Sequence, residues 1–472
     1  MSFLNKPSLA RRFQLVLASF QQRDGLPFAD VLRESQIESA FAEEGAAFAQ
    51  AEEDVYTPAL TLWAFLSQVL FKQEQRSCLA AVTRVVVLLV ALGRPHPSDN
   101  TGDYCRARAK LPERAIRRLA LDTAARLERQ VPSDWLWHGR HVKLVDGTTA
   151  IAADTPANQR VWPQQPQQAQ GLGFPILRVV VLLSLATAMI GGMAMGPYAG
   201  KETGEMALFR ELFGQLAHDD ILLADRHYCS YFQIALLREA GVDCVTRLHQ
   251  CRIAEFHRGQ SLGRRDHLIT WPRPKRPAWM DQTTYDRMPA SLTIRELEVH
   301  VREPGFRTEC LVVVTTLTDA RRYPRDDIAE LYHKRWMVEL DIRAIKDSLG
   351  LDFLRCKSPE MVRKELWIGA LAYNLIRQTM AQSGMRQGAS PRRMSFTAAL
   401  QKLAATWCLL PLADDRQATL LVNAHLEHMA RHEIGHRPNR TEPRAVKRRP
   451  KPHDLLRIPR SEARAALLAS RR

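Results

Sequence analysis

Apolar residues recur at helical spacing over the first part of the chain. Between about residues 8 and 135 they form stretches such as TLWAFLSQVLF and LAAVTRVVVLLVAL, whose period predicts helices. Thr57 followed by Pro58 predicts a helix start, because threonine caps free backbone N–H groups and proline fits the first helical turn. We therefore predict a helical N-terminal domain over residues 1–135.

Near His141 the pattern changes from helical to strand-like. The runs HVKLVDGTTAIA, ILRVVVLLSL and AMIGGMAMG predict three strands, and GEMALFRELFGQL, DDILLADRHY, YFQIALLREAG and VDCVTRL then predict helix, strand, helix and strand. Val179–Gly196 has no charged residue and approaches the length of a membrane span, but its glycines and polar residues divide it into two buried strands. The expected fold class is α/β, a mixed sheet with helices packed on it.

Residues 250–310 interrupt this order with short basic pieces such as LITWPRPKRPAWM and the strand-like run SLTIRELEVHVRE. They predict a β-rich insertion that divides the sheet domain into residues 136–249 and 311–390. Residues 391–472 predict a helical segment and a basic tail, with 13 Lys/Arg against four Asp/Glu from residue 431 onward. The helical segment either dimerises or packs on its own chain. The tail either adds nonspecific DNA affinity or serves only as a solubilising extension.

The segment LYHKRWMVELDIRAIKDSLG, residues 331–350, combines two helical stripes. Tyr332, Arg335, Glu339, Arg343 and Lys346 fall within an arc of roughly 80° on a regular α-helix. Beside them runs an apolar stripe of Leu331, Val338, Ile342, Ile345 and Leu349. One carboxylate held among cations suits a metal-binding acid beside a polyanion. Taken alone, however, the segment fits a surface helix with solvated i,i+4 pairs better.

Charge and cysteine usage narrow the class of protein. The formal charge of +16 and the isoelectric point near 9.7 favour a polyanionic partner, with an anionic membrane surface as the competing explanation. The stretch YCRARAKLPERAIRRLALDTAARL fits a DNA-reading helix and a solvated basic face about equally. Eight scattered cysteines without a CxxC pair, and no signal-peptide pattern, predict a cytoplasmic protein with reduced thiols.

Two aspartates end predicted strands. Asp146 follows HVKLV and Asp225 follows ILLA, and acids at the carboxyl ends of neighbouring strands can converge. Each alone would more often be a turn residue or a helix cap. Together with Glu339 they form a histidine-free carboxylate set, which suits Mg²⁺ or Mn²⁺. Two such ions can activate an attacking hydroxyl and stabilise the leaving oxygen in phosphoryl transfer.

In this order, the motifs resemble those of the DDE transposases of bacterial insertion sequences, in the group with a Tyr-x2-Arg-x3-Glu-x6-Lys signature. The signature positions here are Tyr332, Arg335, Glu339 and Lys346. The match extends to VKLVDGTT around Asp146, LLADRHYCSY around Asp225 and LAYNLIR at residues 371–377, and covers most of the chain to about residue 380.

The resemblance implies a ribonuclease H-like catalytic domain split by the β insertion. It implies Asp146, Asp225 and Glu339 as catalytic metal ligands for Mg²⁺ or Mn²⁺, two ions per site. Tyr332, Arg335, Lys346, Arg343 and Arg247 would contact DNA. Some relatives hold a flipped base against an insertion-domain tryptophan, for which Trp271 and Trp279 are candidates, although a tryptophan that only anchors the β module is an equal alternative.

The expected function is cut-and-paste DNA transposition: hydrolysis at the transposon ends, then strand transfer into target DNA. A stand-alone Mg²⁺-dependent nuclease and a non-catalytic DNA-binding derivative are the alternatives. No ATP is expected, because the loop GPYAGKE is one residue short of a phosphate loop and Glu202 replaces its hydroxyl residue. The expected partners are terminal inverted repeats and target DNA, with a homodimer assembled on DNA, at the bacterial nucleoid and not at a membrane.

Overall fold

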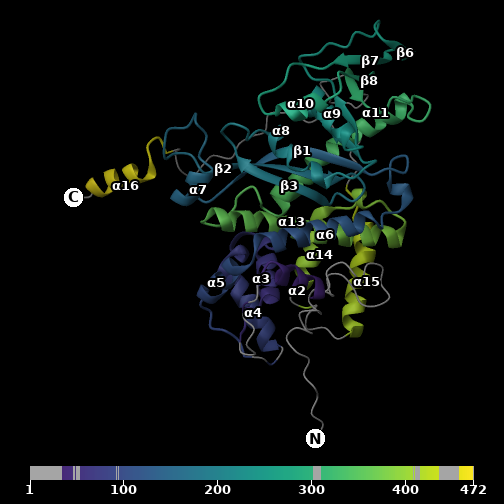
Figure 1. Ribbon diagram of the computed structural model, residues 1–472. Helices are drawn as coiled ribbons and strands as arrows, with labels where there is room; N and C mark the ends of the chain where they lie inside the picture. Colours follow the sequence, from purple (N-terminus) through teal and green to yellow (C-terminus); the bar gives the residue numbers. More distant parts are fainter. Residues whose placement is uncertain are drawn as a thin grey trace. The chain divides into compact units, whose positions relative to one another are not determined.

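The computed structural model describes residues 34–45, 48, 54–91, 93, 95–300, 310–407, 409, 415–434 and 456–470 (Figure 1). The chain divides into two compact units. The helical unit comprises Met1–Leu136, Ala186–Gly191 and Leu340–Ile434, and the sheet unit comprises Trp137–Leu185, Gly192–Glu339 and Gly435–Arg472. The helical pattern expected before residue 34 and the part of the basic tail at 435–455 lie outside the described residues.

The helical unit is organised around one long buried helix, α13 (Pro359–Gln387). Against it pack α3 (Pro58–Leu70), α6 (Glu113–Glu128), α14 (Phe396–Thr406) and α15 (Asp415–Arg431). The unit also contains α2 (Glu34–Glu43), α4 (Cys78–Ala91) and α5 (Gly102–Lys110). The predicted start of α3 is confirmed, since the Leu60 N–H donates to the Thr57 hydroxyl at 3.3 Å.

Two polar residues of the LAYNLIR motif hold the helical unit together. The fully buried Asn374 amide accepts from Ile190 N at 2.8 Å and donates to Ile190 O and Ala120 O. Arg377, also buried, donates to Asp341 at 2.7 Å. These contacts are architectural, because buried polar groups of this kind must be paired to avoid a desolvation penalty.

The sheet unit is built on one nine-stranded mixed sheet in the order β3-β2-β1-β4-β5-β9-β8-β7-β6. Strand β1 pairs antiparallel with β2, while β1, β4 and β5 run parallel; the strands from β5 through β9, β8 and β7 to β6 pair antiparallel. The mixed α/β class is therefore confirmed. The strands are β1 (Val142–Ile151), β2 (Ile176–Ser184), β3 (Ile190–Pro197), β4 (Ile221–Ala224), β5 (Asp243–Arg247), β6 (Gln260–Gly263), β7 (Asp266–Pro272), β8 (Ser291–His300) and β9 (Cys310–Thr315).

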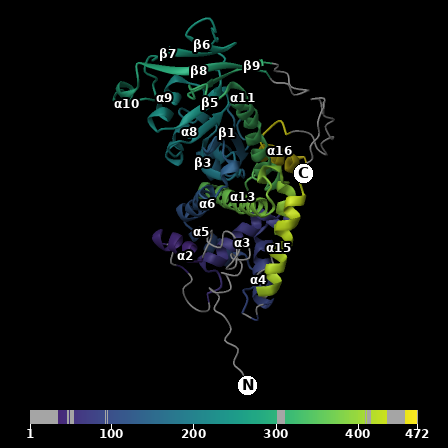
Figure 2. The same cartoon turned by 90° about the vertical axis from the view of Figure 1, so that its right-hand side faces the viewer.

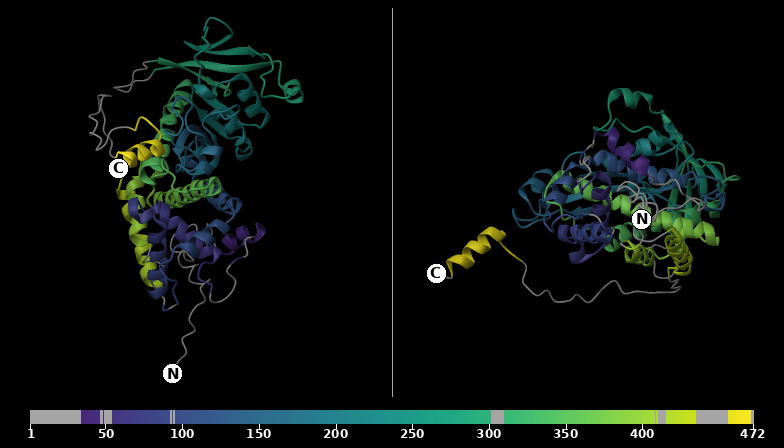
Figure 3. Two further views of the ribbon diagram at one scale, coloured as in Figure 1. Left: turned by 90° about the vertical axis from the view of Figure 1, so that its left-hand side faces the viewer. Right: turned by 90° about the horizontal axis from the view of Figure 1, so that it is seen from below.

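Helices cover both faces of this sheet (Figures 2 and 3). Helices α8 (Glu205–Arg210), α9 (Tyr231–Glu239) and α10 (Gln282–Arg287) lie on one face, and α11 (Arg325–His333) lies on the other. A hydrophobic core that includes Val145, Leu222 and Ala224 from the strands joins the first face to its helices. Two short helices, α7 (Pro156–Val161) and α16 (Arg460–Ala469), complete the unit.

The segment at 250–310 is β-rich, and its strands extend the main sheet instead of closing into a separate module. The link is β9, in which Thr315 pairs with Val245 of β5 and with Arg295 of β8. Residues 340–390, which the sequence placed with the sheet, cluster with the helical unit because α13 packs against α3 and α6. None of the described helices is long and apolar enough to cross a membrane.

Candidate active site

Strand register brings three of the predicted site residues to one level of the sheet. Leu144 of β1 is the partner of Leu223 in β4, which in turn is the partner of Val245 in β5. Two residues further along these strands stand Asp146, Asp225 and Arg247, respectively. Side chains two residues apart on a strand share a face, and Asp225 keeps extended backbone angles after β4 ends.

Asp146 does not end its strand, contrary to the sequence prediction. Strand β1 continues to Ile151 because its pairing with β2 extends to Ile151 and Ile176, whereas its pairing with β4 stops at Leu144. Asp146 therefore lies in mid-strand, just past the last residue of β1 that pairs with β4. This position leaves its carboxylate at the carboxyl end of the parallel part of the sheet.

Local backbone bonds fix the two aspartates. Asp146 Oδ1 accepts from the Gly147 N–H at 2.8 Å, and Asp225 Oδ1 accepts from the His227 N–H at 2.7 Å. Asp225 thereby caps the short 3-10 turn Arg226–Tyr228. Asp225 therefore has two features at once: it caps a turn, as a single aspartate often does, and it is aligned with Asp146.

The segment that carries Glu339 is not the single regular α-helix that the sequence predicted. Helix α11 is followed by a 3-10 turn at Lys334–Trp336, by α12 (Met337–Arg343) and by a π-helical turn at Ala344–Ser348. The Leu349 N–H bonds to Ala344 O, five residues back. The predicted arc assumed a rotation of about 100° per residue throughout the segment. This assumption does not hold beyond Arg343, where the π-helical turn contains Lys346. Single π-turns inside helices are frequent at functional sites.

Three signature residues lie close to the aligned acids. Arg335 Nη2 donates to Glu339 Oε1 at 3.1 Å, and both side chains are half-buried. Tyr332 is only 7% exposed, and burial raises its pKa to about 12 despite the nearby charges of Arg335 and Arg247. Asp225 adds to that rise, which places Tyr332 within electrostatic range of the aligned acids.

The electrostatics of Asp146 describe a site rich in negative charge. Burial raises its pKa to about 6; the Gly147 N–H and Arg335 oppose the rise, while Asp225 and Glu205 add to it. Burial is the main cause of this rise, and the neighbouring acids add to it. A set of carboxylate oxygens is the donor type that a hard divalent cation prefers. Asp146, Asp225 and Glu339 thus fit Mg²⁺ or Mn²⁺ by donor type.

By distance alone a different set stands out. Among the residues that the structure describes, the group of three possible ligands whose atoms all lie within 4.8 Å is Glu298, His300 and Cys310. His300 and Cys310 are exposed strand-end residues, where such groupings are common without a metal. Asp146 and Asp225 are distinguished instead by the strand register that aligns them and by the charge of Asp225, which helps to raise the pKa of Asp146.

The remaining predicted residues differ in their exposure and in their contacts. Arg343 is exposed at the end of α12, and Lys346 is half-buried in the π-turn. Trp271, 3% exposed on β7, donates its indole N–H to Glu296 at 3.1 Å, and β7 is separated from β4 by three strands. Trp279 is half-buried, with the Arg210 guanidinium 4.0 Å from the centre of its ring.

Glu205 and Tyr228 belong to the same region but were not predicted. Glu205 stands in the first turn of α8, where sequence pattern suggests only a helix-favouring acid. Tyr228 follows Asp225 in the motif LLADRHY, and its buried hydroxyl has no hydrogen-bond partner within the described residues. They come near Asp146 only because α8 packs over β1 in the folded chain. No local sequence pattern therefore predicts that they belong to this region.

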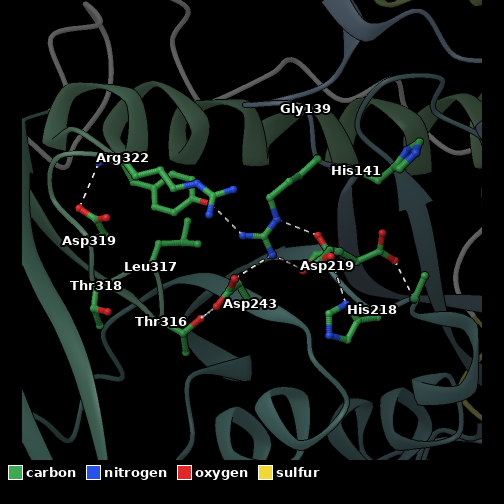
Figure 4. A pocket seen from close by; sticks show the side chains of 14 residues that line it. Gly139, His141, His218, Asp219, Asp243, Thr316, Leu317, Thr318, Asp319 and Arg322 are labelled. Carbon is green, nitrogen blue, oxygen red and sulfur yellow. Dashed lines mark hydrogen bonds and ion pairs between the residues drawn. The ribbon is translucent and has the colours of Figure 1, made fainter.

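The sheet unit also contains a cavity of about 610 Å³ at the opposite end of the parallel strands (Figure 4). Gly139 and His141 precede β1 and Asp219 precedes β4 along its wall. Arg140 crosses it and is already paired, to Asp243 at 2.7 Å and to the carbonyl of Asp219. The cavity therefore does not belong to the carboxylate site.

Comparison with known families settles the class of protein. A family model described as "Transposase DDE domain" matches residues 137–375, about half of the chain. The chain belongs to the transposase DDE domain family. As a DDE transposase it is an enzyme of DNA transposition that breaks and exchanges phosphodiester bonds, and members of the family generally use divalent metal ions.

Two individual proteins are similar to this chain. The transposase InsG for insertion sequence element IS4 of Escherichia coli (strain K12) is 25% identical over 344 residues, which are 72% of this chain and 73% of that protein. A solved structure of piggyBac transposase, a synaptic complex with hairpin DNA, covers 88% of this chain and 85% of its own, with 10% identity and a TM-score of 0.42.

Proposed function

We propose that this transposase moves a bacterial insertion sequence by cut-and-paste transposition and belongs to the group with the Tyr-Arg-Glu-Lys signature. The alignment of Asp146 and Asp225 at the end of two parallel strands, with the Arg335–Glu339 pair close to Asp146, carries the proposal. We assign Asp146, Asp225 and Glu339 as metal ligands, in a ribonuclease H-like core formed by strands β1 to β5.

A pair of bound Mg²⁺ or Mn²⁺ ions would activate the attacking hydroxyl and offset charge on the leaving oxygen. The protein's own residues orient the DNA. Arg335 and Arg247 are half-buried cations next to the acids, suited to hold phosphate oxygens. Arg343 and Lys346 would add further contacts along the DNA backbone. ATP is not needed, because phosphodiester bonds are exchanged directly.

Tyr332 supports these contacts from a buried position. It is buried within electrostatic range of Arg247 and Arg335, and we assign its hydroxyl a contact with the DNA phosphate beside these two cations. Of the two tryptophans, Trp279 is the better base-stacking candidate, because a base could reach Trp271 only after that buried ring was uncovered.

The terminal inverted repeats and target DNA are the proposed partners. Two transposon ends require two active sites, so we propose a homodimer assembled on DNA, in the bacterial cytoplasm at the nucleoid. The charge of +16 supports a DNA partner through counterion release.

The test is Mg²⁺-dependent cleavage and strand transfer with DNA that carries the element's terminal repeats. We expect Asp146→Asn and Glu339→Gln to lose both reactions while they still bind the DNA. Cleavage that persists in these variants would refute the assignment. Hydrolysis without joined products would favour a stand-alone nuclease, and binding without cleavage in several divalent metals would favour a non-catalytic derivative.

A further inference from the structure

A fourth carboxylate reaches the acid site from the face of the sheet opposite Glu339. Glu205 begins α8, which lies on the α9 side of the sheet, whereas Glu339 follows α11 on the other side (Figure 2). A Cβ atom built on Gly147 would lie 2.4 Å from the Glu205 Cδ. The carboxylate of Glu205 therefore occupies the space that a side chain at position 147 would take, next to Asp146.

The end of the strand pairing lets the two faces meet at this point. Strands β1 and β4 pair only as far as Leu144 and Leu223, so no ladder of hydrogen bonds separates Asp146 from Asp225 two residues later. A carboxylate that approaches from the α8 face can therefore contact the same solvent as the aspartates and interact with them electrostatically. Its charge does act on Asp146, raising the pKa of that carboxyl together with Asp225.

Glu205 is not neutralised within the described residues. It forms no ion pair and accepts no hydrogen bond there, although it is half-buried. Arg178, a cation close to Gly204, donates to the carbonyl of Thr203 at 2.9 Å and stacks on Tyr198. Arg178 thus fixes the loop that precedes α8 and leaves the Glu205 carboxylate available.

A second observation points to a ligand at the same place. Tyr228 is 1% exposed, and its hydroxyl has no hydrogen-bond partner among the residues that the structure describes. The negative groups that act most strongly on it are Glu205, Asp146 and Asp225, in that order. A buried hydroxyl left unpaired costs about 1–3 kcal/mol, so such a group usually faces a water or an ion.

We propose that Glu205 is a fourth carboxylate of the divalent-cation site and that the Tyr228 hydroxyl assists it by holding water of the bound cation. This inference rests on the proposed function, because it takes Asp146 and Asp225 as cation ligands. Glu205 and Glu339 then enclose the cation site from the two faces of the sheet, with the aspartates between them.

The test measures cation affinity instead of catalysis. The full-length protein, stripped of divalent ions, is titrated with Mn²⁺ and free Mn²⁺ is followed by electron paramagnetic resonance. We expect Glu205→Gln to weaken Mn²⁺ binding about 5- to 10-fold and Tyr228→Phe to weaken it about 2- to 3-fold. Glu211→Gln, which removes an exposed acid at the other end of α8, is the matched control and should not change the affinity.

The variant Asp146→Asn distinguishes a failure of the proposed Glu205 role from a failure of the proposed function. If Asp146→Asn weakens Mn²⁺ binding and Glu205→Gln does not, the inference is overturned and the proposed function stands. If Asp146→Asn leaves the affinity unchanged, the cation site itself fails, and the inference with it. Glu205→Asp, which keeps the charge on a shorter side chain, should recover part of the affinity; no recovery beyond Glu205→Gln would assign Glu205 a merely structural role.

Discussion

Asp146 and Asp225 stand at the same level of two neighbouring parallel strands, because Leu144 pairs with Leu223 and each acid follows two residues later. This alignment concentrates negative charge that folding alone does not favour. Burial and the nearby acids keep the pKa of Asp146 at about 6, above its ordinary value of 3.8. Such a loss of stability is what a proposed cation-binding position would be expected to show.

A first prediction concerns stability and pH in the absence of divalent ions. Between about pH 4 and pH 6 folded Asp146 holds its proton more often than unfolded Asp146 does, so the free energy of unfolding falls as the pH rises through this window. Asp146→Asn removes that loss. At pH 7.5 in EDTA it should be more stable than the parent by about 1–3 kcal/mol in urea titrations, with no difference below pH 4.

The exposed Asp286 of α10 offers the control for this measurement, and Asp286→Asn should change the free energy of unfolding by less than about 0.5 kcal/mol. Saturating Mg²⁺ should stabilise the parent more than Asp146→Asn. An Asp146→Asn protein less stable than the parent in EDTA would contradict the prediction.

A second prediction concerns Arg335, which bonds Glu339 at 3.1 Å and lies within electrostatic range of Asp146. Arg335→Ala should weaken binding of terminal-repeat DNA and lower the slope of log affinity against log salt by about 1, the loss of one phosphate contact. Fluorescence anisotropy at several salt concentrations measures both. Lys334→Ala, which removes a neighbouring cation paired with the exposed Glu330, should leave the slope nearly unchanged; equal slopes in all three proteins would exclude a phosphate contact by Arg335.

A third prediction separates the two tryptophans. Trp271→Phe removes the N–H that Glu296 accepts, a carboxylate that also binds His267, and should lower the free energy of unfolding by about 1–3 kcal/mol. Trp279→Ala should instead reduce the quenching of a 2-aminopurine placed at the transposon end, with a smaller effect on stability. Quenching that depends on Trp271 in a folded variant, and not on Trp279, would reverse the assignment.

Two buried amides of α13 make a matched pair for a fourth prediction. Asn374 pairs all of its polar atoms with Ile190 and Ala120, whereas the side chain of Gln378, one turn later, has no hydrogen-bond partner in the described part of the chain. Asn374→Leu should destabilise the protein by about 2–4 kcal/mol, because the Ile190 backbone groups lose their partner. Gln378→Leu should be neutral or stabilising in the same thermal and urea titrations, and equal losses in the two variants would contradict this account.

The order of the strands and the alignment of Asp146 with Asp225 could be predicted from the sequence, because both depend on local signals. The role of the three acids stays a prediction. Alternating and helical periods locate β1, β4 and the helix that bears Glu339, and parallel strands place their carboxyl ends at one edge of the sheet. What local signals cannot supply is the length of each pairing. Strand β1 continues past Asp146 because β2 is a longer partner than β4.

Contacts between distant segments account for the other differences. The π-turn at Ala344–Ser348 interrupts a segment whose apolar spacing fits a regular helix, so periodicity misplaces Lys346 relative to Glu339. Glu205 is the first residue of the short helix α8, and only its position over Gly147, 58 positions earlier in the chain, connects it with Asp146. Such a relationship becomes visible only when the sheet and its helices are assembled.

A last prediction uses the space between Gly147 and Glu205. In Gly147→Ala the new methyl group would take the position of the Glu205 carboxylate, and the half-buried glutamate can swing away at little cost in stability. Gly147→Ala should therefore weaken Mn²⁺ binding about as much as Glu205→Gln does, and the double variant should be no weaker than either single one, because both changes remove the same group. Additive losses in this double-mutant cycle would show that the two residues act independently, and would mean that the methyl group disturbs Asp146 directly.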